Sequence, residues 1–267
     1  MSRVTVTVED RIAHVELTRA DKLNAIDEEM FVALDETSAR VRDDEDLAAI
    51  VLSGAGRSFS AGLDFSMHAS FADEGSSGLR PYADPDDPAA TGQRRPGRGQ
   101  RIVSAFRDAH APVIAALHGH VIGGAMQIAL GADIRVVAPD ARLGLREIDF
   151  GMTVDMGASQ LLPRLIGTDR ALDLLLTGRL LSGEEAVAWG LATRVSDDPL
   201  ADALATARGI AERSPTAVKE SKRLVQMSQT ATLAEGFHEE LRVMSANIGS
   251  PDQVAATQRY LARRKEQ

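Results

Sequence analysis

The 267-residue sequence has no cysteine, few aromatic residues and no long apolar segment. Without cysteine the chain can form neither disulfide bonds nor a zinc site with thiolate ligands, and it has no cysteine nucleophile. No apolar run approaches the roughly 20 residues that a membrane-spanning helix needs. Residues 1–10 alternate as a strand does and have no signal-peptide apolar block, so we expect a cytoplasmic protein.

Basic residues are fewer than acidic residues. The chain has 30 Lys and Arg against 39 Asp and Glu, which gives a formal net charge of −9. This balance argues against a nucleic-acid-binding surface. An anionic small ligand is still compatible with it, because local basic clusters remain at residues 94–101 and 263–265. We therefore expect a small-molecule ligand and no nucleic-acid partner.

What the chain does contain is the pattern of a mixed α/β core over residues 1–197. Alternation over residues 4–17 predicts a β-hairpin, and Asp27 is the expected N-cap of a helix that runs to about Arg42. Apolar runs at residues 47–52 and 112–117 predict buried strands. The strand–helix–strand order predicts crossover units and hence a partly parallel sheet.

Two regions depart from this pattern. Residues 65–100 are rich in Gly, Pro, Asp and Ser, and we expect a loop that forms a lid or a substrate-facing insert. Residues 198–267 read as helices alone, which we predict to be a separate C-terminal region. Helices of this kind cannot bury both faces by themselves, so their spare apolar faces must meet the core or another subunit.

The rest of the chain is arranged around residues 112–160. Here a predicted strand enters a Gly123-Gly124 turn and then a helix, which leaves unpaired backbone N–H groups at the positive end of the helix dipole. Such a place can hold an anion, or an oxygen that becomes anionic in a transition state. Glu147 and Asp155 follow downstream. For an isolated Gly-Gly pair, a tight corner with surface acids is the plainer interpretation.

Further motifs favour the functional interpretation, and they lie at residues 19–25, 54–64, 120–124, 178–186, 214–215 and 260–265. With all of these motifs in this order and spacing, the chain resembles the crotonase superfamily of acyl-CoA hydratases and isomerases. The resemblance covers nearly the whole chain and implies a ββα spiral fold with a C-terminal helical trimerisation region. It also implies an acyl-CoA substrate of the fatty acid β-oxidation type, a homotrimer or dimer of trimers, and no cofactor or metal besides the CoA of the substrate.

The resemblance also implies which residues form the site. Members of this family stabilise a thioester enolate with two backbone N–H groups, which correspond here to those of Leu63 and Gly124. Tail residues would reach CoA in the same subunit or in a neighbouring one. The residues expected to bind CoA or the acyl group are Lys22, Leu23, Ala61, Asp64, Gly123, Tyr260 and Lys265.

One departure bears on the reaction. Hydratases of this family use two glutamates, at the positions of Gln127 and Glu147. An amide neither donates nor accepts a proton at neutral pH, so Gln127 cannot be half of an acid–base pair. The remaining pair, Glu147 with Asp155, is similar to that of the dienoyl-CoA isomerases. The match is incomplete, since those isomerases tend to carry an acid at position 127 as well.

We therefore expect a double-bond isomerase that uses Glu147 and Asp155 as acid and base, with Gly151 breaking the helix so that both face one cavity. The alternatives are an enoyl-CoA hydratase, and an acyl-CoA binder with little catalytic activity. A serine hydrolase would need Ser58 or Ser60 beside a histidine, but no Gly-x-Ser-x-Gly elbow is present. Asp155 also has a structural alternative, as the N-cap of a helix that begins there.

Overall fold

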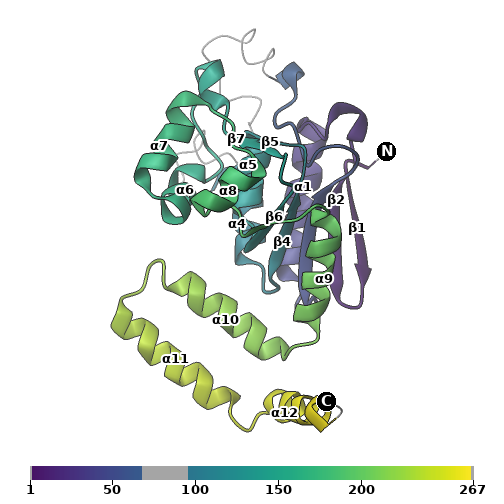
Figure 1. Cartoon of the computed structure of the whole chain (residues 1–267), viewed down its shortest axis with the longest axis vertical. Coiled ribbons are helices and arrows are strands. Elements are labelled where there is room, and N and C mark those ends of the chain that lie inside the picture. The colour runs from purple at the N-terminus through teal and green to yellow at the C-terminus, as the bar shows by residue number, and fades with distance from the viewer. Residues whose placement is uncertain (1, 68–95, 266–267) are drawn as a thin grey trace.

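The computed structural model describes residues 2–67 and 96–265, and its centre is a six-stranded sheet in the order β1-β2-β3-β4-β6-β8 (Figure 1). Only β1 and β2 pair antiparallel, and every other neighbouring pair is parallel. The predicted hairpin and the partly parallel sheet are therefore confirmed. The strands are β1 Val4–Glu9, β2 Ile12–Leu17, β3 Ala49–Gly54, β4 Val113–Leu117, β6 Ile134–Val137 and β8 Arg194–Val195.

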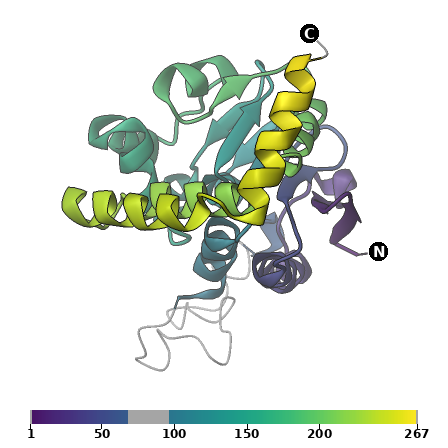
Figure 2. The same ribbon diagram turned by 90° about the horizontal axis from the view of Figure 1, so that it is seen from below.

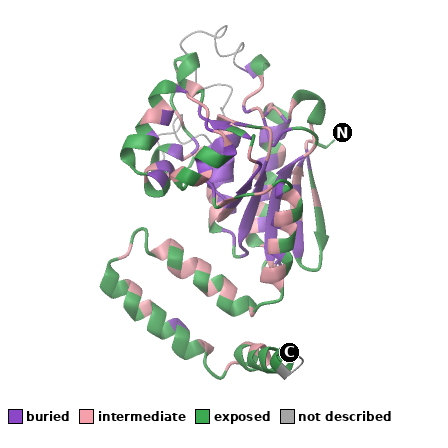
Figure 3. Ribbon diagram, in the orientation of Figure 1, coloured by how far each residue is buried: buried purple, intermediate pink, exposed green. Residues whose placement is uncertain are grey.

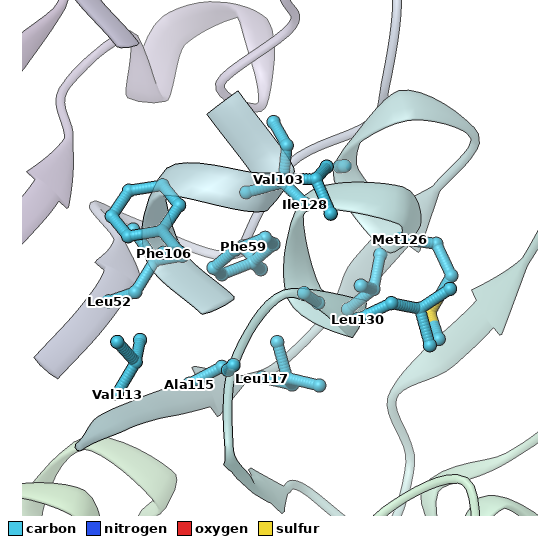
Figure 4. Packing of buried hydrophobic residues seen from close by; sticks show 14 of the residues in the cluster. Leu52, Phe59, Val103, Phe106, Val113, Ala115, Leu117, Met126, Ile128 and Leu130 are labelled. Carbon is cyan, nitrogen blue, oxygen red and sulfur yellow. The ribbon is translucent and has the colours of Figure 1, made fainter. Parts of the chain in front are cut away.

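One face of the sheet carries the main hydrophobic core. Strand residues from β3 and β4 pack there against helix α4 (Arg98–Asp108) and helix α5 (Gly124–Leu130), as Figure 4 shows. Helix α1 (Glu28–Asp43) packs beside α4, and its predicted N-cap is confirmed because the Asp27 side chain accepts a hydrogen bond from the Met30 N–H. All residues of α5 after Gly124 are buried, so this short helix is held firmly in place.

The opposite face is covered by α9 (Pro199–Ala211). Ala203 and Ala207 are fully buried there against strand residues such as Val51 and Ile114, since small side chains let a helix lie close to a sheet. The predicted division at residue 198 assigns α9 to the C-terminal helical region, although α9 packs on the sheet. The division itself stays a prediction.

A second, two-stranded parallel sheet pairs β5 (His120–Ile122) with β7 (Arg142–Gly144). The sequence pattern predicts only a turn between residues 118 and 124, and a strand of three residues is too short to show an alternating pattern. The remaining elements near this sheet are η1 Ala20–Lys22, η3 Glu147–Phe150, α6 Ala158–Ile166, α7 Thr168–Thr177 and α8 Gly183–Trp189.

The last three helices extend away from the sheet. Helices α10 (Pro215–Met227) and α11 (Leu233–Asn247) lie side by side, and α12 (Pro251–Lys265) turns away from them (Figure 2). Most of their surface is exposed in the single chain (Figure 3). Within residues 2–67 and 96–265, no helix is long and apolar enough to cross a membrane.

Most of the predicted loop over residues 65–100, namely residues 68–95, lies outside the described residues. At its two ends the prediction is wrong, because residues 65–67 are helical and α4 already begins at Arg98. Helix α4 has a polar, arginine-rich first turn, which hides its start in the sequence pattern.

Candidate active site

A cavity of about 940 Å³ lies where four parallel strands end. Strands β2, β3, β5 and β7 lead at their carboxyl ends into the segments that line it, namely residues 19–26, 57–66, 122–127 and 146–156. Ligands of α/β proteins commonly bind beyond the carboxyl ends of parallel strands, where the loops of several strands converge. The fold therefore brings together segments that are distant in sequence, and these include most of the predicted site residues.

The segment after β3 is pinned on both sides. Ile26 pairs with Leu63 in an isolated parallel bridge, in which the Ile26 N–H donates to the Gly62 carbonyl at 2.8 Å and the Asp64 N–H donates to the Ile26 carbonyl at 2.9 Å. On its other side the segment pairs through Ser60 with Val121 of β5. In a parallel bridge of this kind the residue between the two bonded groups directs its own N–H the other way. The Leu63 N–H therefore points away from Ile26.

The second predicted donor lies at the start of α5. Gly123 has φ 56° and ψ −124°, a conformation that favours glycine, and it turns the chain from β5 into the helix. Gly124 is the first helical residue, so its N–H has no acceptor inside the helix. Among the described residues, neither the Leu63 N–H nor the Gly124 N–H donates a hydrogen bond. Both residues line the cavity. The oxyanion hole that they are expected to form stays a prediction.

Gly62 explains how the two donor segments come so close. Its φ is +86°, and a Cβ at this position would lie 2.5 Å from the Ile122 carbonyl oxygen. Any side chain would therefore push the segment after β3 away from the end of β5. The glycine is required by both its backbone conformation and the close approach.

Glu147 stands beside the glycine turn. A Cβ built on Gly123 would lie 3.5 Å from Glu147 Oε1 and 4.0 Å from Oε2. The residue begins the short helix η3, which ends at Gly151 with φ 68°. This left-handed residue breaks the helix as predicted, and the chain then returns along the same cavity through Met152 and Asp155. Both predicted acid–base residues therefore face one cavity.

The structural alternative for Asp155 is wrong. Helix α6 begins at Ala158, and its N-cap residue is Gly157, with φ 105°. Instead of a capping aspartate, the side chain of Gln127 supplies the acceptor: its Oε1 accepts hydrogen bonds from the Met156 N–H at 2.9 Å and the Ala158 N–H at 3.4 Å. Asp155 is thereby left facing the cavity, where it is accessible to solvent.

Gln127 contacts Glu147 as well. Its Nε2 donates to Glu147 Oε1 at 2.8 Å, and the residue is only 1% exposed. Sequence reasoning identified Gln127 as the place where an acid is missing, but it did not reveal these contacts. Its partners lie 20 to 31 residues further along the chain, so no local pattern signals them.

The pKa values of both carboxyl groups are raised. Burial raises the pKa of Glu147, and the charge of Asp155 raises it further, whereas the hydrogen bond from Gln127 lowers it. Glu147 Oε2 is buried without a hydrogen-bond partner among the described residues. The pKa of Asp155 is raised too, because protein groups surround it even though the cavity admits solvent. The charge of Asp155 reaches Glu147, so ionisation of Asp155 disfavours ionisation of Glu147.

Several predicted CoA-binding residues also line the cavity. Lys22, Leu23 and Ala61 lie together there, with the Ala61 N–H donating to the Leu23 carbonyl at 2.9 Å. Arg57 lines the same cavity and was not predicted, although it lies within a motif segment. Lys22 and Arg57 give this side of the cavity positive charge that suits phosphate groups.

Asp64 lines the cavity but is occupied by the protein. Its Oδ1 accepts hydrogen bonds from the Ser66 N–H and hydroxyl, and its Oδ2 binds Arg19 Nη1 at 2.6 Å. These bonds, from Ser66 first and then Arg19, lower the pKa of Asp64 to about 2. In the single chain Asp64 therefore holds the donor segment in place.

Tyr260 does not line this cavity in the single chain. Tyr260 is 65% exposed on α12, which lies at the opposite end of the molecule (Figure 1). Lys265 is the last residue of α12. A contact between these residues and the CoA of a neighbouring subunit stays a prediction.

The serine residues of the hydrolase alternative serve the fold. Ser58 is 1% exposed and lies 3.1 Å from His120 Nδ1, and the Ser60 hydroxyl is fully buried and donates to the Asn24 carbonyl at 2.7 Å. Neither lines the cavity. No group of three or more potential metal-ligating side chains occurs within the described residues either.

Comparisons with known proteins show which family the sequence matches. The family model described as enoyl-CoA hydratase/isomerase matches residues 7–267. The chain is 31% identical over 257 residues to the peroxisomal Delta(3,5)-Delta(2,4)-dienoyl-CoA isomerase of Arabidopsis thaliana, covering 95% of this chain and 91% of that protein. It is 32% identical over 271 residues to a Mycobacterium bovis protein named "Probable enoyl-CoA hydratase echA8", covering 100% and 98%.

Solved structures show the same fold. The crystal structure of enoyl-CoA hydratase from Thermoplasma volcanium superposes with a TM-score of 0.82 at 30% identity, covering 97% of this chain and 98% of that one. This agreement confirms the predicted fold class, including the helices at the C-terminal end.

Proposed function

Because this chain belongs to the enoyl-CoA hydratase/isomerase family, we propose that it moves a carbon–carbon double bond along an acyl-CoA thioester, as a dienoyl-CoA isomerase of fatty acid β-oxidation does. The observation that carries this proposal is the pairing of Glu147 and Asp155 on one cavity, with an amide at position 127. The similarity to the Arabidopsis isomerase supports it. The similarity to proteins named as hydratases is of about the same strength, so the side chains of the cavity carry the argument.

In the proposed reaction the thioester oxygen accepts hydrogen bonds from the N–H groups of Leu63 and Gly124. One ionised carboxylate removes a proton from a carbon of the unsaturated chain, and the electrons delocalise into the thioester as a dienolate held by those two donors. The other carboxyl, which is protonated, delivers a proton to a second carbon. The double bonds have then moved, and no water has been consumed.

The positions of the two carboxyls indicate which reacting carbon each one serves. Glu147 lies against the Gly123 turn, next to the proposed oxyanion donor of Gly124, and so serves the carbon near the thioester. Asp155 is carried by the returning segment and serves the remote carbon. The raised pKa values of both groups support a site in which one carboxyl holds the proton that the other gives up.

Hydration is the second candidate, and the similarity to hydratases favours it. Water addition needs a base for the water and an acid for the α-carbon. Gln127 can be neither, and its amide is already engaged with Glu147. Asp155 would then have no role in the reaction. The third candidate, a catalytically weak acyl-CoA binder, would bind these substrates with little turnover.

The test is a panel of 2-enoyl-, 3-enoyl- and 3,5-dienoyl-CoAs with product identification by mass and ultraviolet spectra. We expect the 3,5-dienoyl-CoA to be converted to the conjugated 2,4-dienoyl-CoA faster than 2-enoyl-CoA is hydrated. Faster hydration would overturn the isomerase proposal, and binding without turnover of any substrate would favour the binder. A cytoplasmic location stays a prediction.

A further inference from the structure

We propose that Gln127 is a positioning residue that sets the spacing between the two carboxyl groups. One side chain holds Glu147 through its N–H and the backbone beside Asp155 through its carbonyl oxygen. This inference rests on the proposed function for the roles of Glu147 and Asp155, but the contacts that carry it belong to the fold.

The contacts require both a donor and an acceptor. Gln127 Oε1 accepts from the buried N–H groups of Met156 and Ala158, and Nε2 donates to Glu147 Oε1. An ionised glutamate could accept the first two bonds, but it has no proton to donate to a second carboxylate. An apolar residue of the same size would make none of them and would leave buried N–H groups unpaired. An amide satisfies all three contacts.

The support behind Gln127 is rigid. The residue is 1% exposed, and its neighbours on α5 are buried in the main core. Gly124 lies three residues earlier on the same helix, so the proposed oxyanion donor and Gln127 lie on one helix face. Helix α5 therefore connects the site of the thioester oxygen to both carboxyls through a single side chain.

The hydrogen bond from Gln127 also determines which oxygen of Glu147 can take part in proton transfer. Gln127 binds its Oε1, so the other oxygen, Oε2, is the one available for proton transfer, and it has no other partner among the described residues. Asp155 lies next to Met156, whose N–H is bound by Gln127. Loss of the amide should therefore release both groups at once.

The experiment compares Gln127→Leu and Gln127→Glu with a control variant, Met126→Leu. Met126 is a buried neighbour on the same helix that does not line the cavity, and its replacement conserves volume. We expect Gln127→Leu to lower kcat for isomerisation about 10- to 100-fold, with KM changed little, because misplaced catalytic groups cost rate more than binding. Met126→Leu should behave as the unaltered enzyme.

A second readout does not need turnover. In protein with ¹³C-labelled glutamate carboxyls, the Glu147 signal, assigned with Glu147→Gln, gives the pKa of that group directly. Both Gln127 variants should raise this pKa, because each removes a hydrogen bond to the ionised form. Gln127→Glu should raise it most, because it adds a negative charge. Gln127→Glu also keeps the acceptor for Met156 and Ala158, so it should fold even if Gln127→Leu does not.

The other charged groups on the cavity are unchanged in both variants. Arg19 and Arg146 pair with Asp64 and Asp149, and the other charged residues that line the cavity in the described part of the chain, besides Glu147 itself, are Asp21, Lys22, Arg57 and Asp155. An unchanged Glu147 pKa in folded Gln127→Glu, or a Gln127→Leu enzyme with unaltered kcat, would overturn the positioning role. If the protein without substitutions has no isomerase activity, the proposed function is contradicted instead. The pKa of Glu147 in the Gln127 variants would still test the positioning role of Gln127.

Discussion

At the scale of single residues, Glu147 and Asp155 reach the same cavity in different ways. Glu147 is fixed by a hydrogen bond from Gln127, whereas Asp155 faces the cavity from the chain that returns after Gly151. The pKa of Glu147 is raised by its burial, and that of Asp155 is raised by the protein groups that surround it. This is the electrostatic setting in which one carboxyl can act as base while the other holds a proton.

Removing the charge of either carboxyl should reduce isomerisation. We expect Glu147→Gln and Asp155→Asn each to lower kcat about 10²-fold or more, the usual contribution of a positioned acid or base. Asp149→Asn is the matched control, because Asp149 lines the same cavity but pairs with Arg146. Steady-state kinetics with a 3,5-dienoyl-CoA would check this. Full activity in Asp155→Asn would exclude its proposed role.

The raised pKa of Glu147 also predicts an effect on stability. The folded state favours the neutral carboxyl, so stability falls as pH rises from the ordinary glutamate pKa, about 4.3, through the raised value in the folded protein. Glu147→Gln cannot ionise and should avoid this loss. Urea unfolding should therefore show the variant to be more stable than the unaltered protein near pH 7.5, with a smaller difference near pH 4. An equal difference at both pH values would contradict the assignment.

Part of this site could be predicted from single residues. The segments that contain Leu63, Gly124, Glu147 and Asp155 carry recognisable motifs, and all four line the cavity. The roles of Gln127 and Asp64 as holders of other groups could not be predicted. Their hydrogen bonds join residues 20 and 45 positions apart, and only the folded chain brings those partners together.

At the scale of elements, the site depends on how closely the segment after β3 approaches the end of β5. Gly62 permits this approach, and the Ile26–Leu63 and Ser60–Val121 bridges hold the segment on its two sides. Strand β5 was missed in the sequence because it has only three residues, and the start of α6 was misplaced because its acceptor is the side chain of Gln127. The long strands and capped helices show their periodicity and were predicted well.

Gly62→Ala tests this arrangement. The new Cβ would clash with the Ile122 carbonyl, and φ of +86° is unfavourable for alanine, so we expect a loss of about 1–3 kcal/mol in unfolding free energy and a large loss of activity. Gly209→Ala in α9 is the control, since a Cβ there meets nothing within 4 Å. It should leave activity unchanged and raise stability slightly. A fully active Gly62→Ala enzyme would show that the close approach is dispensable.

At the scale of the whole molecule, the C-terminal helices are the least buried part of the chain. Val243 is the only buried residue of α10 and α11. Large apolar side chains on α10 and α11 and between α11 and α12 are instead exposed, namely Val225, Leu233, Phe237, Leu241, Met244 and Ile248. Apolar surface on this scale is typical of a subunit interface.

We predict that the chain forms a trimer or a dimer of trimers in which this surface is buried. Sedimentation equilibrium at micromolar concentration should give three or six times the mass of the 28.5 kDa chain. Leu241→Glu should shift the distribution towards smaller species, because Leu241 is 70% exposed in the single chain. Val8→Glu, an exposed position on β1, is the control. A stable monomer of the unaltered chain would contradict this prediction.

The central claim is that the enzyme moves double bonds rather than adding water, and the most direct measurement is product analysis in ¹⁸O-labelled water. With a 3,5-dienoyl-CoA we predict rapid formation of the 2,4-dienoyl product without ¹⁸O, a loss of this conversion in Asp155→Asn, and a rise in whatever hydration exists in Gln127→Glu. In the parallel reaction with a 2-enoyl-CoA, whose 2,3-double bond can add water, uptake of ¹⁸O into a 3-hydroxyacyl product that is faster than isomerisation of the 3,5-dienoyl-CoA, at the same rate in Asp155→Asn, would contradict the claim.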